Sequence, residues 1–148
     1  MCFFLALSVV LVGCKKEVGL EGLYPLKGKI TLDGEPVEGA SISLSPTFSG
    51  ENARSAGAKS DAAGVFNIQT VMPNDGVYPG EYTISVRKMV ATNTYTEEEM
   101  AAANATGESL KNDSNNVLPS MYANGKSSGL KVTVVAGKNE ELIIDLKK

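Results

Sequence analysis

Residues 27–44 constrain the fold of this chain most, because they hold two runs of alternating apolar and polar residues around an Asp-Gly pair. The apolar positions are Leu26, Gly28, Ile30 and Leu32 in the first run and Ala40, Ile42 and Leu44 in the second. Alternation with a period of two predicts strands that each bury one face. Asp33 and Gly34 favour a type I′ turn, in which both central residues take positive φ. We therefore predict a β-hairpin, with weaker pairing beside the turn because Pro36 lacks a backbone N–H.

Further short runs of the same kind predict more strands along the chain. They are residues 53–60, 66–69, 81–86, 130–134 and 142–146, separated by turn or loop sequences at 61–64, 72–76 and 136–139. In the run at 81–86, Tyr82 shares the core-facing register with its apolar neighbours. Residues 118–122 return to apolar character and predict an irregular or one-turn segment that packs on a sheet edge. Seven short strands at this spacing are typical of a β-sandwich.

The stretch from Val90 to Val117 does not follow the strand pattern and is read as an insertion. Thr96 and Glu99 form a capping-box sequence, with Thr96 as N-cap. Three adjacent glutamates in the first turn suit the positive end of a helix dipole. Gly107 and the polar residues after it end the predicted helix. An insertion of this length in a compact domain is either functional or mobile.

The N-terminal segment is apolar from Cys2 to Val12. A run this short does not comfortably span about 30 Å of hydrocarbon as a helix, but it fits the apolar region of a signal peptide. An ordinary secretory signal and a transmembrane anchor are the alternatives. No basic residue precedes the run, so we expect the natural start codon to lie further upstream.

The end of this segment, Leu11-Val12-Gly13-Cys14, resembles the bacterial lipobox. The resemblance implies that residues 1–13 are a lipoprotein signal peptide and that Cys14 becomes the acylated first residue, carrying chains such as palmitate. Residues 14–23 would then be the lipidated Cys and a tether. Since Cys2 leaves with the signal, no free cysteine would remain for a disulfide or a nucleophile. The implied location is the bacterial cell envelope, at the periplasmic face of the outer membrane or the cell surface.

Several local motifs resemble the carboxypeptidase regulatory-like domain, a transthyretin-like fold. They lie at 28–40, 61–66, 79–82 and 118–122, in the order that the family shows. The resemblance covers 24–148, apart from the insertion at about 90–117. It implies a seven-stranded Greek-key β-sandwich that is usually non-catalytic, with Phe66 and Tyr82 in the core. No binding residue can be transferred, because the family has no common one.

The composition argues against several kinds of chemistry. The 148 residues contain no histidine, which removes imidazole base catalysis, Ser-His-Asp triads and the commonest zinc ligand. With 14 basic and 17 acidic residues the net charge is −3, so there is no basic field to attract nucleic acid. Acidic loop residues such as Asp61 and Asp75 lack the spacing of an EF-hand and are best interpreted as turn residues. We therefore predict no catalytic residue, metal or cofactor.

Two tyrosines are the candidate ligand contacts. There is no tryptophan, and Tyr78 and Tyr95 fall in predicted loops. Tyr95 lies beside the inserted helix and is the better candidate. The alternative role for Tyr95 is to pack the insertion onto the sandwich.

From the sequence we expect a non-catalytic, lipid-anchored cell-envelope protein that acts as a binding or structural module. Its partners would be the membrane, through lipid on Cys14, and an envelope protein or glycan. One alternative is an accessory or regulatory subunit of an envelope peptidase or transporter, and another is a carbohydrate-binding module. Specificity is expected in the insertion, because loops on a rigid scaffold usually carry it.

Overall fold

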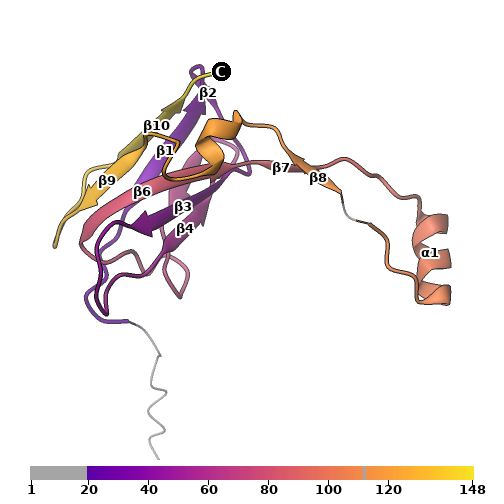
Figure 1. The fold of residues 1–148 in the computed structure, drawn as a ribbon, viewed down its shortest axis with the longest axis horizontal. Coiled ribbons are helices and arrows are strands. Elements are labelled where there is room, and N and C mark those ends of the chain that lie inside the picture. Colours follow the sequence, from indigo (N-terminus) through magenta and orange to yellow (C-terminus); the bar gives the residue numbers. More distant parts are fainter. Residues whose placement is uncertain (1–19, 112) are drawn as a thin grey trace, which may run out of the picture.

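The computed structural model describes residues 20–111 and 113–148, which form mostly β-strands in several sheets with one short α-helix (Figure 1). The elements are β1 (Lys27–Leu32), β2 (Glu35–Pro36), β3 (Ser41–Pro46), β4 (Ala56–Lys59), β5 (Val65–Asn67), β6 (Gly80–Arg87), β7 (Met89–Ala91), α1 (Glu97–Thr106), β8 (Ser114–Asn116), the 3₁₀ helix η1 (Ser120–Ala123), β9 (Lys131–Val134) and β10 (Leu142–Leu146). The predicted all-β class is confirmed. Among the described residues no helix is long and apolar enough to cross a membrane.

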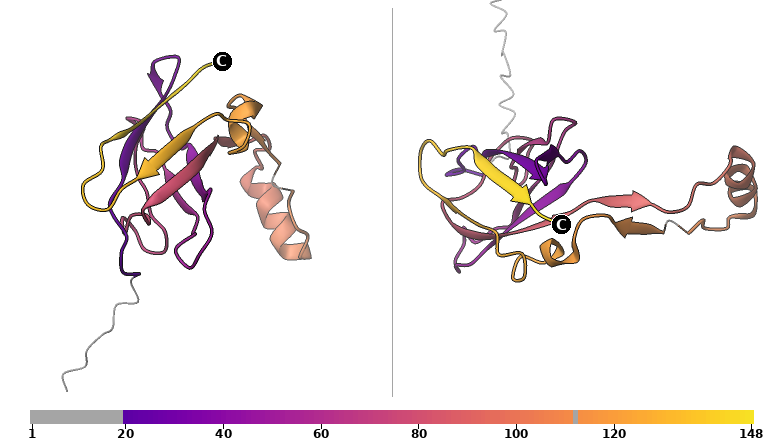
Figure 2. Two further views of the ribbon diagram at one scale, coloured as in Figure 1. Left: turned by 60° about the vertical axis from the view of Figure 1, so that its left-hand side comes forward. Right: turned by 90° about the horizontal axis from the view of Figure 1, so that it is seen from above.

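Two four-stranded sheets make up the body of the molecule (Figures 1 and 2). In the first, β1 is central: β10 pairs with it in parallel, and β5 and β2 pair with it in antiparallel fashion on the other side. The second sheet is antiparallel throughout, with the order β4-β3-β6-β9. A separate two-stranded sheet joins β7 to β8.

Both large sheets contribute to one hydrophobic core. Its fully buried side chains, at most 1 % exposed, include Ile30, Phe66 and Ile144 from the first sheet and Ile42, Leu44, Tyr82, Ile84 and Val86 from the second. These are the positions that the period of two assigned to the buried faces. The predicted faces of the strands, and the core positions of Phe66 and Tyr82, are therefore confirmed.

The predicted hairpin forms only in part. Asp33 and Gly34 have φ of 51° and 88°, as a type I′ turn requires. However, the returning strand β2 is only two residues long, and the second alternating run, which is β3, pairs with β4 and β6 in the other sheet. The remaining side of β1 is occupied: β5 pairs with it, and the Ile30 N–H donates to the Gly64 carbonyl at 2.8 Å. The Val37 N–H still donates to the Ile30 carbonyl at 3.2 Å, but because the Ile30 N–H bonds Gly64 instead of Val37, the pairing ends there and the chain crosses to the second sheet.

The turn at residues 61–64 is confirmed and delivers β5 to β1. The Asp61 carboxylate accepts from the N–H groups of Ala63 at 2.9 Å and Val65 at 2.8 Å. Gly64 has φ of 75°, a conformation that residues with a side chain rarely adopt. The local sequence thus fixes this turn, and the turn places β5 where the predicted hairpin partner would have been.

Residues 89–117, which we call the arm, project away from the two large sheets (Figures 1 and 2). β7 and β8 form a two-stranded ribbon, and α1 lies at its far end. At the base, the Lys88 N–H donates to Asn116 Oδ1 at 2.9 Å, and the Val117 N–H donates to the Lys88 carbonyl at 3.0 Å. The two ends of the arm are therefore adjacent, and the insertion leaves and re-enters the domain at one point.

The predicted helix in the arm is confirmed together with its capping box. The Glu99 N–H donates to Thr96 Oγ1 at 3.3 Å, and the Thr96 N–H donates to Glu99 Oε2 at 2.8 Å. Gly107 forms the C-cap with φ of 70°. In the described part of the arm only Ala103 is buried, so α1 is held by its caps and by few contacts.

Candidate binding site

Tyr95 joins the two limbs of the arm. It lies between β7 and α1, with its ring half-buried. Its hydroxyl donates to the Lys111 carbonyl at 2.6 Å and accepts from Asn93 Nδ2 at 3.1 Å. Both partners belong to the arm itself. The alternative interpretation, in which Tyr95 packs the insertion onto the two large sheets, is therefore wrong: Tyr95 packs the arm onto itself.

A shallow hollow of about 320 Å³ lies beside Tyr95 at the end of the arm. Tyr95, Ala102 and Leu110 supply apolar surface, and Glu99 and Glu108 supply carboxylates. An aromatic ring next to carboxylates suits a cationic or mixed apolar group, such as a lysine or arginine side chain. The Glu99 carboxylate already accepts the Thr96 N–H in the capping box. Glu108 is therefore the carboxylate of this hollow that we expect to contact a ligand.

The ribbon of the arm exposes apolar side chains as well as charge. Met89, Val90 and Val117 are 53 %, 43 % and 55 % exposed. The charged residues in the sequence of the arm are Glu97, Glu98, Glu99, Glu108, Asp113 and, as the one cation, Lys111. An isolated two-stranded ribbon and a helix of 10 residues are each marginally stable in water. A partner that buried this surface would stabilise both.

Tyr78, the other candidate ligand contact, lies in a loop as predicted, but its side chain is buried at 6 % exposure. Its carbonyl accepts a hydrogen bond from the Tyr82 hydroxyl at 3.0 Å. A ring this buried presents little surface to a ligand. Of the two candidates, the structure leaves Tyr95 the more accessible, and ligand contact at either residue stays a prediction.

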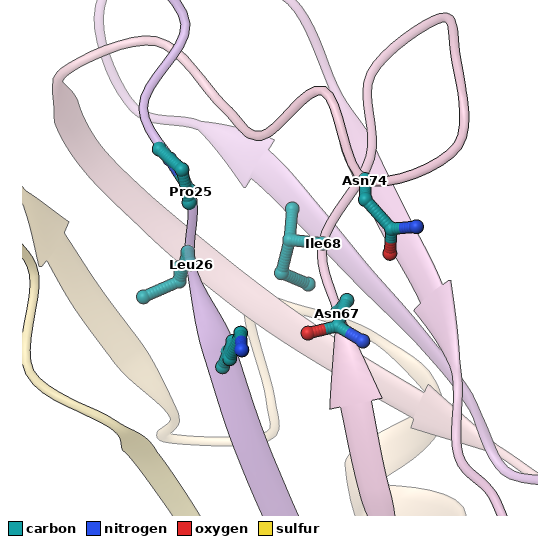
Figure 3. Close-up of a pocket in the computed structure, with 6 residues that line it drawn as sticks. Pro25, Leu26, Asn67, Ile68 and Asn74 are labelled. Carbon is teal, nitrogen blue, oxygen red and sulfur yellow. The ribbon is translucent and has the colours of Figure 1, made fainter.

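A second hollow, of about 300 Å³, lies at the start of β1 (Figure 3). Core residues Leu26 and Ile68 line it together with the polar side chains of Lys27, Asn67 and Asn74. The two amides come from different segments, β5 and the loop at 72–76. No motif marked this site in the sequence, because its residues are brought together only when the sheet forms. The amides and the ammonium could hydrogen-bond a small polar ligand.

The loop beside that hollow is held by Asp75. Its carboxylate accepts from the N–H groups of Thr70 at 2.6 Å, Val71 at 2.9 Å and Met72 at 2.8 Å. Burial raises the pKa of Asp75, but these backbone hydrogen bonds lower it more, and the net pKa lies below its ordinary value. Asp75 therefore fills its acceptor capacity within the loop, which agrees with its interpretation as a turn residue.

Replacing Asp75 by alanine is expected to destabilise the fold by about 2 kcal/mol at neutral pH, because three backbone donors lose a charged acceptor. A carboxyl with a depressed folded-state pKa stabilises the fold above its unfolded pKa of about 3.9, and that stability is lost as pH falls through the folded pKa. Urea unfolding between pH 7 and pH 3 should thus show a flatter acid limb for Asp75→Ala than for the wild type. Glu51→Gln, at an exposed loop position, is the control; equal acid limbs for Asp75→Ala and wild type would contradict the assignment.

In the described ranges, no three or more His, Cys, Asp or Glu side chains gather closely enough to hold a metal ion. Cys14, the predicted lipidation site, lies outside the described residues, as do the predicted signal peptide at 1–13 and the tether up to residue 19. The lipid anchor is therefore a matter of sequence alone.

The family model described as "Domain of unknown function (DUF6795)" matches residues 26–114. The matched range runs from the start of β1 to the start of β8 and so includes α1 and most of the arm. No curated protein and no solved structure matches the chain.

Proposed function

The chain belongs to the family of the domain of unknown function DUF6795, and from its own residues we propose that it is a non-catalytic, lipid-anchored cell-envelope protein that acts as a binding or structural module. The observation that carries the binding role is the arm: an acidic helix on an exposed ribbon, held away from a rigid core. Loops and insertions displayed on a rigid scaffold commonly carry recognition. The arm lies largely within the range matched by the family model, which fits a role belonging to the domain itself.

The scaffold is proposed to be a seven-stranded Greek-key sandwich of the transthyretin-like kind. Apart from the two-residue β2 and the two strands of the arm, seven strands remain, in the orders β5-β1-β10 and β4-β3-β6-β9. Successive strands cross between the sheets from β1 to β3, from β4 to β5, from β5 to β6 and from β9 to β10. Such crossings are what Greek-key connections produce in a sandwich. The resemblance to carboxypeptidase regulatory-like domains supports the same proposal.

A protein partner is favoured over a glycan for the arm. The exposed side chains of Met89, Val90 and Val117 would gain from burial in a protein interface, because burial removes their apolar surface from water. A glycan platform needs an accessible aromatic face, whereas the Tyr95 ring is half-buried and its hydroxyl is engaged. An envelope peptidase or transporter with a basic surface would fit the excess of glutamates on the arm.

The anchor rests on Cys14 and has a direct test. Cys14→Ser is expected to abolish labelling by a palmitate analogue and to release the protein from the membrane fraction, because two or three acyl chains hold a protein almost irreversibly. Cys2→Ser is the matched control, since that residue would leave with the signal peptide and its replacement should change neither readout. Membrane association that survives Cys14→Ser would refute the anchor.

A further inference from the structure

Strand β10 is an open edge of the first sheet. It pairs with β1 on one side, and among the described residues no strand pairs with its other side. The Asp33 N–H donates to the Leu146 carbonyl at 2.9 Å, so the backbone of Leu146 faces β1. Because successive residues of a strand turn their backbone groups to opposite sides, the N–H and C=O groups of Ile143 and Asp145 face the open side.

One end of this edge is closed by a side chain, but its centre is not. The Lys147 N–H donates to the Tyr122 hydroxyl at 3.0 Å, which closes the edge just beyond β10. Within β10, Ile143 is 63 % exposed, the highest value among the exposed large apolar residues of the described chain. Proteins usually blunt an open edge with charge or a bulge, and an apolar residue at its centre instead favours pairing.

We propose that β10 pairs with β10 of a second copy of this chain, antiparallel and about a two-fold axis at Ile144. This interface is separate from the arm and does not depend on the function proposed above. With the axis at Ile144, Ile143 of each copy lies opposite Asp145 of the other, and each pair exchanges backbone N–H···O=C bonds. The two Ile143 side chains are then diagonal neighbours on the outer face, within reach of each other.

The charges along β10 favour a two-fold axis at Ile144 over an axis at Ile143 or at Asp145. The outer face of the edge presents Glu141, Ile143, Asp145 and Lys147 in order. An axis at Ile144 brings the Glu141 side chain of each copy to the Lys147 side chain of the other, so two opposite-charge pairs form. Backbone pairing ends at Asp145, because the Lys147 N–H already donates to the Tyr122 hydroxyl. An axis at Ile143 would instead set Glu141 opposite Asp145, and an axis at Asp145 would set that carboxylate opposite itself. Like charges directly opposite each other destabilise a sheet, whereas opposite charges stabilise it.

The paired segment is only the 5 residues of β10, so the interface is small and we expect a weak, concentration-dependent dimer. Lys147 also pairs with Asp145 of its own chain at 2.7 Å, and Asp145 accepts from the Thr31 hydroxyl at 2.9 Å. In the dimer Lys147 lies between two carboxylates, one from each copy. This network makes the charge on Lys147 the natural point at which to test the register.

Sedimentation equilibrium of the full chain carrying Cys2→Ser and Cys14→Ser, which contains no cysteine, is expected to show a monomer–dimer equilibrium. Glu141→Lys should raise the dissociation constant at least tenfold, and so should Lys147→Glu. The double exchange, Glu141→Lys with Lys147→Glu, should restore dimerisation. Glu140→Lys is the control, since it makes the same charge change one residue further from β10 and should have a much smaller effect. Thermal unfolding of each variant checks that the fold is retained.

A cross-linking experiment tests the position of the axis. In the same cysteine-free chain, Ile143→Cys should be joined to a second copy by a short bis-maleimide, whereas Glu38→Cys, exposed on the connection after β2, should not. A chain that stays monomeric at all concentrations, a double exchange that fails to restore the dimer, or equal cross-linking at both positions would each overturn the proposal.

Discussion

Tyr82→Ala is expected to lower the free energy of unfolding by about 3 to 5 kcal/mol, the range for removing a large aromatic side chain from a core. Tyr82 is fully buried at the centre of the second sheet, on the strand that pairs with both β3 and β9. Its ring meets the ring of Phe48 edge to face, with centroids 5.6 Å apart. Alanine would leave a cavity that the two sheets cannot close without losing their register.

Tyr82→Phe keeps the aromatic ring and removes only the hydroxyl, so it measures the contribution of the hydroxyl alone. The hydroxyl donates to the Tyr78 carbonyl at 3.0 Å, and burial raises the pKa of Tyr82, so the phenol stays protonated and remains a donor. Its removal should cost about 1 kcal/mol, because the Tyr78 carbonyl loses its partner. Urea unfolding followed by circular dichroism measures both variants. A loss of less than 1 kcal/mol for Tyr82→Ala would show that the core is not centred on this residue.

Removing the arm should leave the domain folded and abolish recognition. Residues 89–115 can be replaced by a short Gly-Ser turn that keeps Asn116, because Asn116 bonds the Lys88 N–H at 2.9 Å, the Val117 N–H bonds the Lys88 carbonyl at 3.0 Å and the ends are adjacent. In the described part of the arm only Ala103 is buried, and it lies on α1, so the deletion removes no side chain of the hydrophobic core. The free energy of unfolding should change by no more than about 0.5 kcal/mol. Unfolding of the shortened chain would make the arm part of the core and would remove the proposed binding role.

Photo-cross-linking in the native envelope tests whether the arm is needed to recognise a partner. A photo-cross-linker at Met89 in the intact, anchored protein should join a partner, and the chain without the arm, with the cross-linker at exposed Val71, should not retain that partner. Tyr95→Ala should weaken capture more than Tyr95→Phe, which keeps the ring beside α1 and removes only the two hydrogen bonds of the hydroxyl. A peptidase or transporter as the captured protein would favour the accessory-subunit role. The same partner captured with and without the arm would refute the arm as the site.

The candidate site was predictable only where its signals are local. The capping-box sequence of Thr96 and Glu99 predicted α1, and the end of the alternation between apolar and polar residues predicted the insertion that forms the arm. The projection of the arm, the burial of Tyr78 and the hollow between Asn67 and Asn74 had no sequence signal. Each depends on which segments meet across the fold, and residue types alone do not report that.

The sequence by itself determined the faces of the strands and the turns. Burial alternates because side chains alternate along a strand, and the turns at Asp33-Gly34 and Asp61–Gly64 follow from positive φ and short-range hydrogen bonds. Only the tertiary structure decided which strands pair. The run after the hairpin turn fits either sheet by its alternation, and it joined the second because β5 and β10 fill both sides of β1. Those partners come from distant parts of the chain, so their competition for β1 is settled by packing of the whole core rather than by any local preference.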